Sequence, residues 1–239
     1  MGWQFGDCCK EEFSIFCTVI LSSLNITSVM DKHNEKVNQI NNSTIYFNIY
    51  HQNIRGLWKK ACELLSHLHP DLFYVWQNIF KVFTNEEVHI QNYNLGAYYC
   101  RHICEKSGVA IFVHNSLHFL HTDIYKHCEE KDIKICVLKR LFSILNICVL
   151  TLYTAPSGNF RHFLLILDNI LQFFYTHTLH IICGDIKINC LLESEKKNQL
   201  DNLLLSYNLT NIIHFPTRVQ NTSATATDNI FIDIFQFYS

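Results

Sequence analysis

The sequence predicts an α/β fold in which two mixed β-sheets pack face to face and helices cover them from outside. Hydrophobic residues make up 49% of the 239 residues and charged residues 17%, which is enough apolar material for one large core. Segments with strand composition outnumber those with helix composition, and 133–138 and 145–153 are typical of an antiparallel pair. Only seven Gly are present and none forms a phosphate loop, so the sequence favours packed sheets over a doubly wound, dinucleotide-binding fold.

Eight segments are expected to form strands. Most are continuous apolar runs, which is typical of strands in a sheet that is covered on both faces. Segments rich in Asn, Ser, Pro or charged residues lie between many of them and favour turns. The expected strands are 45–50, 72–76, 109–113, 133–138, 145–153, 179–183, 211–215 and 229–234.

Three segments are expected to form helices, because their apolar residues recur at i, i+3 and i+4 and so form one buried stripe. In the second of them the stripe consists of Phe163, Ile166, Leu167, Ile170, Leu171 and Phe174. The expected helices are 57–68, 160–174 and 195–207.

Residues 1–43 are expected to form a leader and linker outside the domain, which then comprises residues 44–239. The part 25–43 is polar and rich in Asn, as linkers are. The apolar run 13–24 is shorter than the roughly 20 residues that a membrane span needs. Glu11 and Glu12 precede this run, where a signal peptide would carry positive charge. We therefore expect neither a membrane anchor nor a signal peptide.

The cysteines indicate a reducing compartment. The chain has 11 Cys, an odd and scattered number, and several lie inside apolar runs, such as Cys148 and Cys183. This pattern is typical of buried free thiols rather than of a disulfide framework. We therefore expect a nuclear or cytoplasmic protein.

Two clusters of polar residues have both a functional and a plain interpretation. The net charge of −2 means that nucleic-acid binding would depend on a local patch. Arg55, Lys59 and Lys60 form such a patch, although the solvated face of a helix would have the same composition. The segment CRHIC, residues 100–104, could contribute zinc ligands, but no second Cys or His pair follows at finger spacing and ordinary packing explains it better.

Polar residues recur where the expected strands begin or end. Asn53 follows the first strand, Tyr153 ends the strand 145–153, Asp185 follows Gly184 at the end of an apolar run, and Asp228 opens the last strand. Taken singly, each of the Asn and Asp residues also suits an ordinary turn. Together, carboxylate and amide oxygens at one rim would suit Mg²⁺, with Asn53 and Asp185 as candidate ligands.

Five motifs occur in an order that resembles a known family. They are HQNIRGL (51–57), GVAIFVH (108–114), LTLYTAPSGNF (150–160), IICGD (181–185) and ATDNIFID (226–233). They resemble the endonuclease/exonuclease/phosphatase superfamily and, more narrowly, the apurinic-type endonuclease domain of non-LTR retrotransposons. The segments YTAPSGN and NIIHFPTRVQN argue against a lipid or inositol phosphatase branch.

The resemblance implies a four-layer sandwich of the DNase I-like type and a Mg²⁺-dependent endonuclease, with Mn²⁺ as a possible substitute. Such an enzyme hydrolyses phosphodiester bonds and nicks DNA to prime reverse transcription. The implied partner is DNA, with no small-molecule cofactor, and the implied state is a monomer. By position, Asn53 would lie near the metal and the phosphate, Tyr153 would contact the phosphate, Asp185 would align the attacking water, and Asp228 would orient a C-terminal histidine.

The sequence departs from the family pattern at three places. The family motif GDxN has Lys187 at its last position. The metal-binding glutamate that is expected after the strand 72–76 is replaced by Gln77 and Asn78. The family's C-terminal SDH motif does not occur before Ser239. We therefore expect a degenerate, C-terminally truncated copy with weakened metal binding and impaired catalysis. The alternative is an inactive remnant that binds DNA weakly at most.

Lys187 has two interpretations. Its ammonium group could form an ion pair with Asp185 and so hold this carboxylate away from a catalytic role. Alternatively, Lys187 could simply point to solvent after a turn, as most lysines do.

Overall fold

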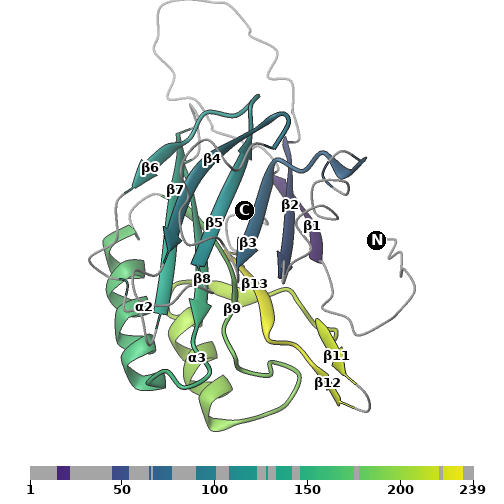
Figure 1. Ribbon diagram of the computed structural model, residues 1–239. Coiled ribbons are helices and arrows are strands. Elements are labelled where there is room, and N and C mark those ends of the chain that lie inside the picture. Colours follow the sequence, from purple (N-terminus) through teal and green to yellow (C-terminus); the bar gives the residue numbers. More distant parts are fainter. Residues whose placement is uncertain are drawn as a thin grey trace, which may run out of the picture.

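Two large β-sheets pack face to face in the computed structural model (Figure 1). One sheet has five strands in the order β1-β2-β3-β5-β4, and the other has six in the order β10-β13-β9-β8-β7-β6. Both sheets mix parallel and antiparallel neighbours, and helices cover the second sheet, so the predicted fold class is confirmed. The structure describes residues 15–21, 45–53, 65, 67–76, 90–100, 108–122, 128, 133–141, 146–174, 178–220 and 223–233.

The five-stranded sheet is mostly antiparallel, with one parallel pair, β2 with β3. The pairing of β4 with β5 contains an irregularity between Leu95 and Ala97, where the register shifts by a residue. Its strands are β1 (Ile15–Leu21), β2 (Ile45–Asn53), β3 (Leu72–Trp76), β4 (Tyr93–Cys100) and β5 (Gly108–His114).

Strand β1 lies in a segment that the sequence analysis assigned to a leader outside the domain. Instead, Ile15–Leu21 pair along their whole length with β2 and form one edge of the sheet. The physical reason is that the segment is rich in β-branched and aromatic residues, while the edge of β2 offers free backbone groups that an apolar strand can pair with. The domain therefore includes residues before Thr44, and the other parts of 1–43 lie outside the described residues.

In the six-stranded sheet, β7 and β8 form the expected antiparallel pair, and β8 is parallel to β9. A short hairpin of β11 (Arg218–Gln220) and β12 (Ser223–Thr225) leads into the last strand. The expected strand 211–215 is shifted, because pairing with the last strand covers residues 209–211 only. The six strands are β6 (Leu120–Thr122), β7 (Ile133–Leu141), β8 (Asn146–Thr154), β9 (Thr178–Asp185), β10 (Leu209–Asn211) and β13 (Asp228–Asp233).

Helices α2 (Phe160–Phe174) and α3 (Glu195–Leu205) cover the outer face of this sheet. The apolar stripe predicted for 160–174 is the buried face of α2. The oxygen of Ser194 caps α3 by accepting a hydrogen bond from the Lys197 backbone N–H at 3.2 Å. The expected helix 57–68 falls mostly outside the described residues. No helix in the described part of the chain is long and apolar enough to cross a membrane.

Alternating side chains of the six-stranded sheet serve two cores. Val149 and Tyr153 of β8 belong to the core between the sheets, whereas Leu150 and Leu152 belong to the core under the helices. This alternation is the period of two that a strand imposes on its side chains. Cys148 and Cys183 are buried and are not joined to another described cysteine, as predicted.

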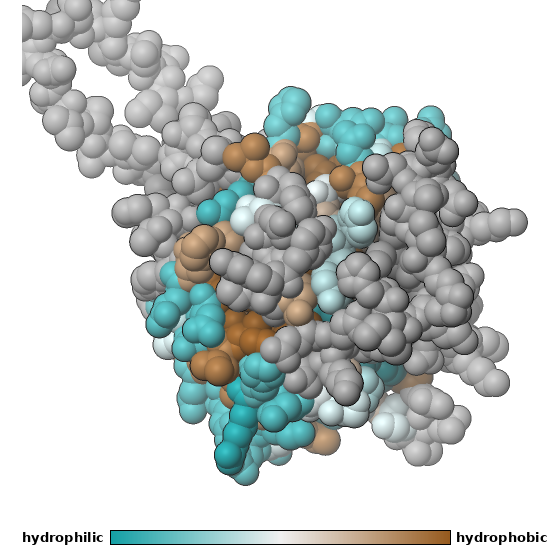
Figure 2. Space-filling model, turned by 60° about the vertical axis from the view of Figure 1, so that its left-hand side comes forward, coloured by the Kyte–Doolittle hydropathy of each residue, from teal (hydrophilic) through white to brown (hydrophobic). Residues whose placement is uncertain are grey.

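The outer surface is not wholly polar. Figure 2 shows apolar residues in brown between hydrophilic ones, in a view that brings forward the left-hand side of Figure 1. Among the described residues, the large exposed apolar side chains include Leu120, Leu165 and Phe173. Exposed apolar atoms of this kind are common on folded proteins.

Gly184 is expected to be irreplaceable, whereas Gly96 is not. A Cβ atom at Gly184 would lie 2.3 Å from the backbone oxygen of Leu152, while one at Gly96 would meet the ends of two side chains at 2.7 and 2.8 Å and a backbone oxygen only at 3.3 Å. Side-chain ends can move and a strand backbone in a sheet cannot. Gly184→Ala should therefore cost more than about 2 kcal/mol of unfolding free energy and Gly96→Ala about half as much. Urea denaturation measures both, and equal losses would contradict this account.

His180 should make stability fall in mild acid. Burial lowers the pKa of this histidine to about 4, so the unfolded chain binds the extra proton between pH 6.5 and pH 4 and the folded chain does not. The stabilisation that His180 provides while it is neutral is complete above pH 6.5. At pH 5 it should be reduced by about 2 kcal/mol. The glutamine in His180→Gln cannot titrate. The difference in unfolding free energy between this variant and the unchanged chain, measured by urea denaturation, should therefore change by this amount between pH 7 and pH 5. A constant difference would refute the prediction.

Candidate functional site

Four polar residues form a row across the end of the six-stranded sheet. Lys134 of β7 lies opposite Tyr153 of β8, Tyr153 opposite Asp185 of β9, and Asp185 opposite Asp228 of β13. Residues that face each other across neighbouring strands project on the same side of the sheet. Since Tyr153 belongs to the core between the sheets, the whole row projects toward the five-stranded sheet.

Asn53 lies at the same end of the sandwich. It is the last residue of β2 and is paired with Trp76, which is paired in turn with Val109. The backbone oxygen of Val109 is 3.6 Å from the sulfur of Cys136, two residues from Lys134. The strand end that carries Asn53 therefore faces the row, although the side chain of Asn53 is outside the described residues.

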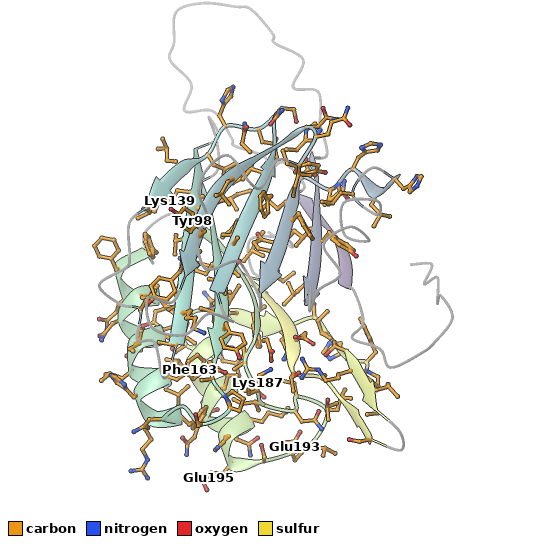
Figure 3. All side chains as sticks on the ribbon, viewed as in Figure 1. Tyr98, Lys139, Phe163, Lys187, Glu193 and Glu195 are labelled. Carbon is orange, nitrogen blue, oxygen red and sulfur yellow. The ribbon has the colours of Figure 1, made fainter. Side chains whose placement is uncertain are left out.

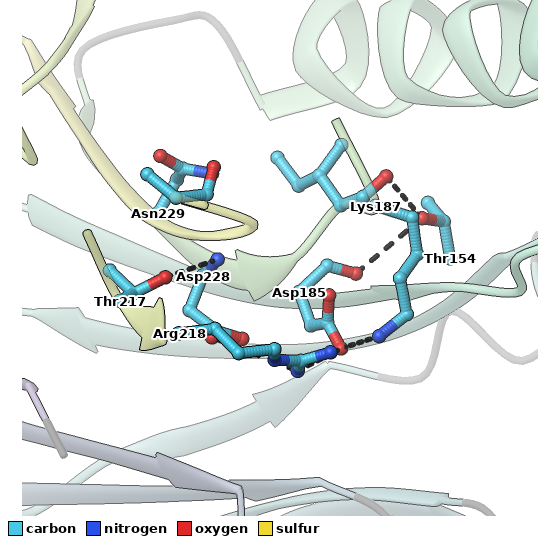
Figure 4. A network of polar contacts seen from close by, with 9 residues as sticks. Thr154, Asp185, Lys187, Thr217, Arg218, Asp228 and Asn229 are labelled. Carbon is cyan, nitrogen blue, oxygen red and sulfur yellow. Dashed lines mark hydrogen bonds and ion pairs between the residues drawn. The ribbon is translucent and has the colours of Figure 1, made fainter. Parts of the chain in front are cut away.

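Asp185 is fully buried and is held by two cations (Figure 4). The Lys187 ammonium group donates a hydrogen bond to Oδ2 of Asp185. Nη2 of Arg218 lies 3.6 Å from the same oxygen and 3.9 Å from Oδ2 of Asp228. The predicted ion pair between Lys187 and Asp185 is thus confirmed, and a second cation joins it.

The backbone at Lys187 has an unusual conformation. Its φ angle is 60°, in the left-handed region that Gly and Asn tolerate better than Lys. The loop is fixed just before it, because Thr154 Oγ1 donates to the Ile186 carbonyl at 2.5 Å and the Ile186 N–H donates to the Thr227 carbonyl at 2.9 Å. Figure 3 shows Lys187 at the end of the sheets away from Tyr98 and Lys139. The asparagine implied by the family resemblance would suit this backbone.

The ring of Tyr153 lies close to two ammonium groups. Nζ of Lys134 is 4.2 Å and Nζ of Lys187 5.5 Å from the ring centroid. Ammonium groups at these distances are attracted to the electron-rich face of the ring. Tyr153 and Lys134 are both buried, so the ammonium group of Lys134 lies inside the protein beside the tyrosine ring.

Asp228 differs from Asp185 in its surroundings. Burial and the neighbouring charge of Asp185 raise the pKa of Asp228 to about 8, although Arg218, Lys187 and Thr217 oppose the rise. The backbone N–H of Asp228 donates to Thr217 Oγ1 at 3.2 Å. Asp228 therefore holds its proton up to a higher pH than an ordinary aspartate does.

The described residues do not fit a Mg²⁺ ion. Magnesium needs several oxygen ligands and, in most sites, carboxylate charge that is free to face it. Here the charge of Asp185 already faces Lys187 and Arg218, and both cations would repel a divalent ion. Oδ1 of Asp185 and Oδ1 of Asp228 are buried without a hydrogen-bond partner, but two oxygen atoms are too few to form the ligand set of a Mg²⁺ ion. No group of three or more His, Cys, Asp or Glu residues in the described ranges could hold a metal ion.

Sequence reasoning missed Arg218. It is the first residue of the hairpin β11–β12, whose base is closed by a hydrogen bond from the Thr217 N–H to the Thr225 carbonyl at 2.9 Å. This hairpin brings Arg218 back to Asp228, ten positions later in the chain, and across β13 to Asp185. The only signal in the sequence was an arginine inside the family-like segment NIIHFPTRVQN, shortly before Asp228.

The remaining candidates lie outside the described residues. They are Gln77 and Asn78, the patch of Arg55, Lys59 and Lys60, and the zinc candidates His102 and Cys104 together with the side chain of Cys100.

Comparison with protein-family models and with curated protein sequences gives no match. Solved structures do match. The endonuclease domain of TRAS1, a telomere-specific non-LTR retrotransposon, aligns with a TM-score of 0.58 over 78% of this chain and 84% of its own, at 11% identity. AP endonuclease LMAP from Leishmania major aligns with a TM-score of 0.61 over 78% of each chain, at 14% identity. The chain has the endonuclease/exonuclease/phosphatase fold.

A third structure with the endonuclease/exonuclease/phosphatase fold is TDP2 from D. rerio, complexed with a single strand DNA product. It aligns with a TM-score of 0.55 over 78% of this chain and 83% of its own, at 14% identity. At such low identity the likeness concerns the fold alone, which here consists of two mixed β-sheets with helices.

The two carboxyl groups should respond differently to neutralisation. Asp185→Asn leaves Lys187 and Arg218 facing a neutral group and should cost about 2 kcal/mol of unfolding free energy, less than the roughly 3–5 kcal/mol for a fully buried ion pair because both cations retain some solvent exposure. Asp228→Asn replaces a group that is already mostly neutral at pH 7 and should cost less than about 1 kcal/mol. Urea denaturation at pH 7 compares them, and a greater loss for Asp228→Asn would contradict the assigned charges.

Proposed function

We propose that this chain is a retrotransposon-type endonuclease domain with impaired catalysis, which keeps a nucleic-acid-binding fold but cleaves phosphodiester bonds poorly. The observation that carries the proposal is the position of Asp185, buried and in contact with Lys187, with Arg218 3.6 Å away. A carboxylate that is to align water for attack on a phosphate has to accept a hydrogen bond from that water. The hydrogen bond from Lys187 takes up part of this capacity on Oδ2 of Asp185, and the charge of Arg218 attracts the same oxygen.

The proposed substrate and partner is DNA, bound weakly. Support comes from the fold, which the TRAS1 endonuclease and a DNA-bound TDP2 share, and from the motif order in the sequence. Asn53, Tyr153, Asp185 and Asp228 are the proposed remains of the catalytic set, with Tyr153 toward the phosphate. Arg55, Lys59 and Lys60 are the proposed contacts to backbone phosphates. The proposed setting is a monomer in the nucleus or cytoplasm, without a small-molecule cofactor.

In this proposal a divalent metal ion binds more weakly than in active relatives. The resemblance implies Mg²⁺ or Mn²⁺ in active relatives, where it would supply charge stabilisation at the phosphoryl oxygens. In this chain the described residues of the row do not fit such an ion, so we expect Mg²⁺ binding to be weak. The second candidate function, a remnant that is wholly inactive and binds DNA weakly, is favoured by the same ion pair, and the extent of residual nicking separates the two.

A plasmid-nicking assay tests the proposal. Incubated with supercoiled DNA and Mg²⁺ or Mn²⁺, the chain should nick far more slowly than an active relative such as the TRAS1 endonuclease domain under the same conditions. Any nicking that remains should disappear with EDTA and in Asp185→Ala. Robust nicking by the unchanged chain that Asp185→Ala abolishes would overturn the claim of impairment.

Restoring variants test the cause of the impairment. Lys187→Asn alone should recover little nicking. Adding a glutamate at Gln77 or Asn78 and the family's C-terminal SDH segment should recover clear Mg²⁺-dependent nicking, because each lost group acts only in the presence of the others. The matched control carries the same glutamate and tail but keeps Lys187. If this control nicks as well as the full combination, Lys187 is not an obstacle.

DNA binding is measured separately by fluorescence anisotropy with a labelled oligonucleotide. Binding should weaken steeply with salt, as expected for phosphate contacts. Replacing Arg55, Lys59 and Lys60 by Gln together should lower the slope of log K against log salt by up to about three. Absence of any binding at low salt would refute the proposed partner.

A further inference from the structure

We propose that Lys187 and Arg218 take the place of a divalent cation, so that the charge of the carboxyl pair at Asp185 and Asp228 is compensated without metal. The ammonium and guanidinium groups together carry two positive charges, the same charge as one Mg²⁺ or Mn²⁺ ion. Neither residue is assigned a metal-replacing role by the resemblance or by the likeness to solved structures. The proposal concerns the electrostatics of the site and goes beyond the proposed function.

The geometry of the four groups supports this proposal. Lys187 and Arg218 both approach Oδ2 of Asp185, and Arg218 also approaches Oδ2 of Asp228. One guanidinium group thus spans two carboxyl groups on neighbouring strands, β9 and β13, as a bridging metal ion would. Asp185 is fully buried, and a buried carboxylate needs compensating charge within a few ångström.

The two cations come from different parts of the chain. Lys187 lies on the loop after β9, and Arg218 lies on the hairpin β11–β12. Figure 4 shows them reaching the Asp185 carboxylate, with the Arg218 guanidinium extending from beside Asp228. The ion pairs therefore tie the loop and the hairpin to the end of the sheet, which is a structural effect that a bound metal would otherwise provide.

Arg218 is held at the two carboxyl groups by charge attraction and not by hydrogen bonds. Its contacts of 3.6 and 3.9 Å are too long for hydrogen bonds, and Nε and Nη2 are buried without hydrogen-bond partners. Arginine cannot relieve this by losing its proton, since its guanidinium group stays charged in proteins. The attraction of the carboxyl groups therefore compensates for burying these donors.

The test compares metal binding and stability. In the unchanged chain, neither Mn²⁺ nor EDTA should shift the Tm measurably, and the electron paramagnetic resonance signal of free Mn²⁺ should barely fall on addition of protein. The double variant Lys187→Gln/Arg218→Gln should have a lower Tm in EDTA, and Mn²⁺ should raise it. Its affinity for Mn²⁺ should exceed that of the unchanged chain at least roughly tenfold, which corresponds to about 1.4 kcal/mol.

Two control variants make the result specific. Arg161→Gln/Lys139→Gln removes the same net charge away from Asp185 and should leave Mn²⁺ binding unchanged. Adding Asp185→Asn to the double variant should abolish the new Mn²⁺ binding. Arg218→Gln alone should give an intermediate gain.

Three outcomes would overturn the proposal. The unchanged chain could bind Mn²⁺ as tightly as the double variant does, in a way that depends on Asp185. The double variant could bind no more Mn²⁺ than the charge-matched control does. The double variant could also fail to fold with and without Mn²⁺, whereas folding only in the presence of Mn²⁺ would support the proposal. DNA binding is not a readout here, so a chain that binds no DNA would refute the proposed function and leave this inference standing.

Discussion

The buried charge of Asp185 is the constraint on which the rest of this end of the molecule depends. Its carboxylate lies at the end of β9, on a face that packs against the other sheet, where water cannot neutralise it. Lys187 and Arg218 supply the compensating charge. The ion pairs connect the loop after β9 and the hairpin β11–β12 to the same oxygen atom, because each of them carries one cation to Oδ2 of Asp185.

Lys187 meets this requirement at a cost to the backbone. A lysine at a φ angle of 60° is disfavoured by about 1 kcal/mol or more relative to Gly. The loop is nevertheless held there by the hydrogen bonds of Ile186 to Thr154 and Thr227, which do not depend on the residue that follows. The backbone of the site is thus set by its neighbours, and the side chain at position 187 decides only what meets Asp185.

The sequence predicted what depends on local periodicity and missed what depends on distant partners. Helix α2 and the pair β7–β8 were predictable because their apolar patterns agree with their packing. Strand β1 resembled a leader, since only its pairing with β2 makes it part of the sheet. Strand β4, with Asn94, Gly96 and a register shift, lacks the regular alternation of a strand. The carboxylates of the site were visible at the strand ends, whereas Arg218 was not, because its role exists only once the hairpin folds back.

Fold and catalysis place different demands on the same carboxylates. A nuclease of this fold needs Asp185 to be compensated by something that also helps to polarise a phosphate and to align water, whereas the fold needs only that the charge be compensated. If Lys187 and Arg218 replace a divalent cation, they provide the charge that the fold needs but not the polarisation of phosphate and alignment of water that catalysis needs. A chain with these two residues can then lose metal binding and cleavage while its fold stays stable and Asp185 stays buried. Its stability is therefore no measure of its activity, and the likeness of its fold to that of solved endonuclease structures does not by itself indicate cleavage.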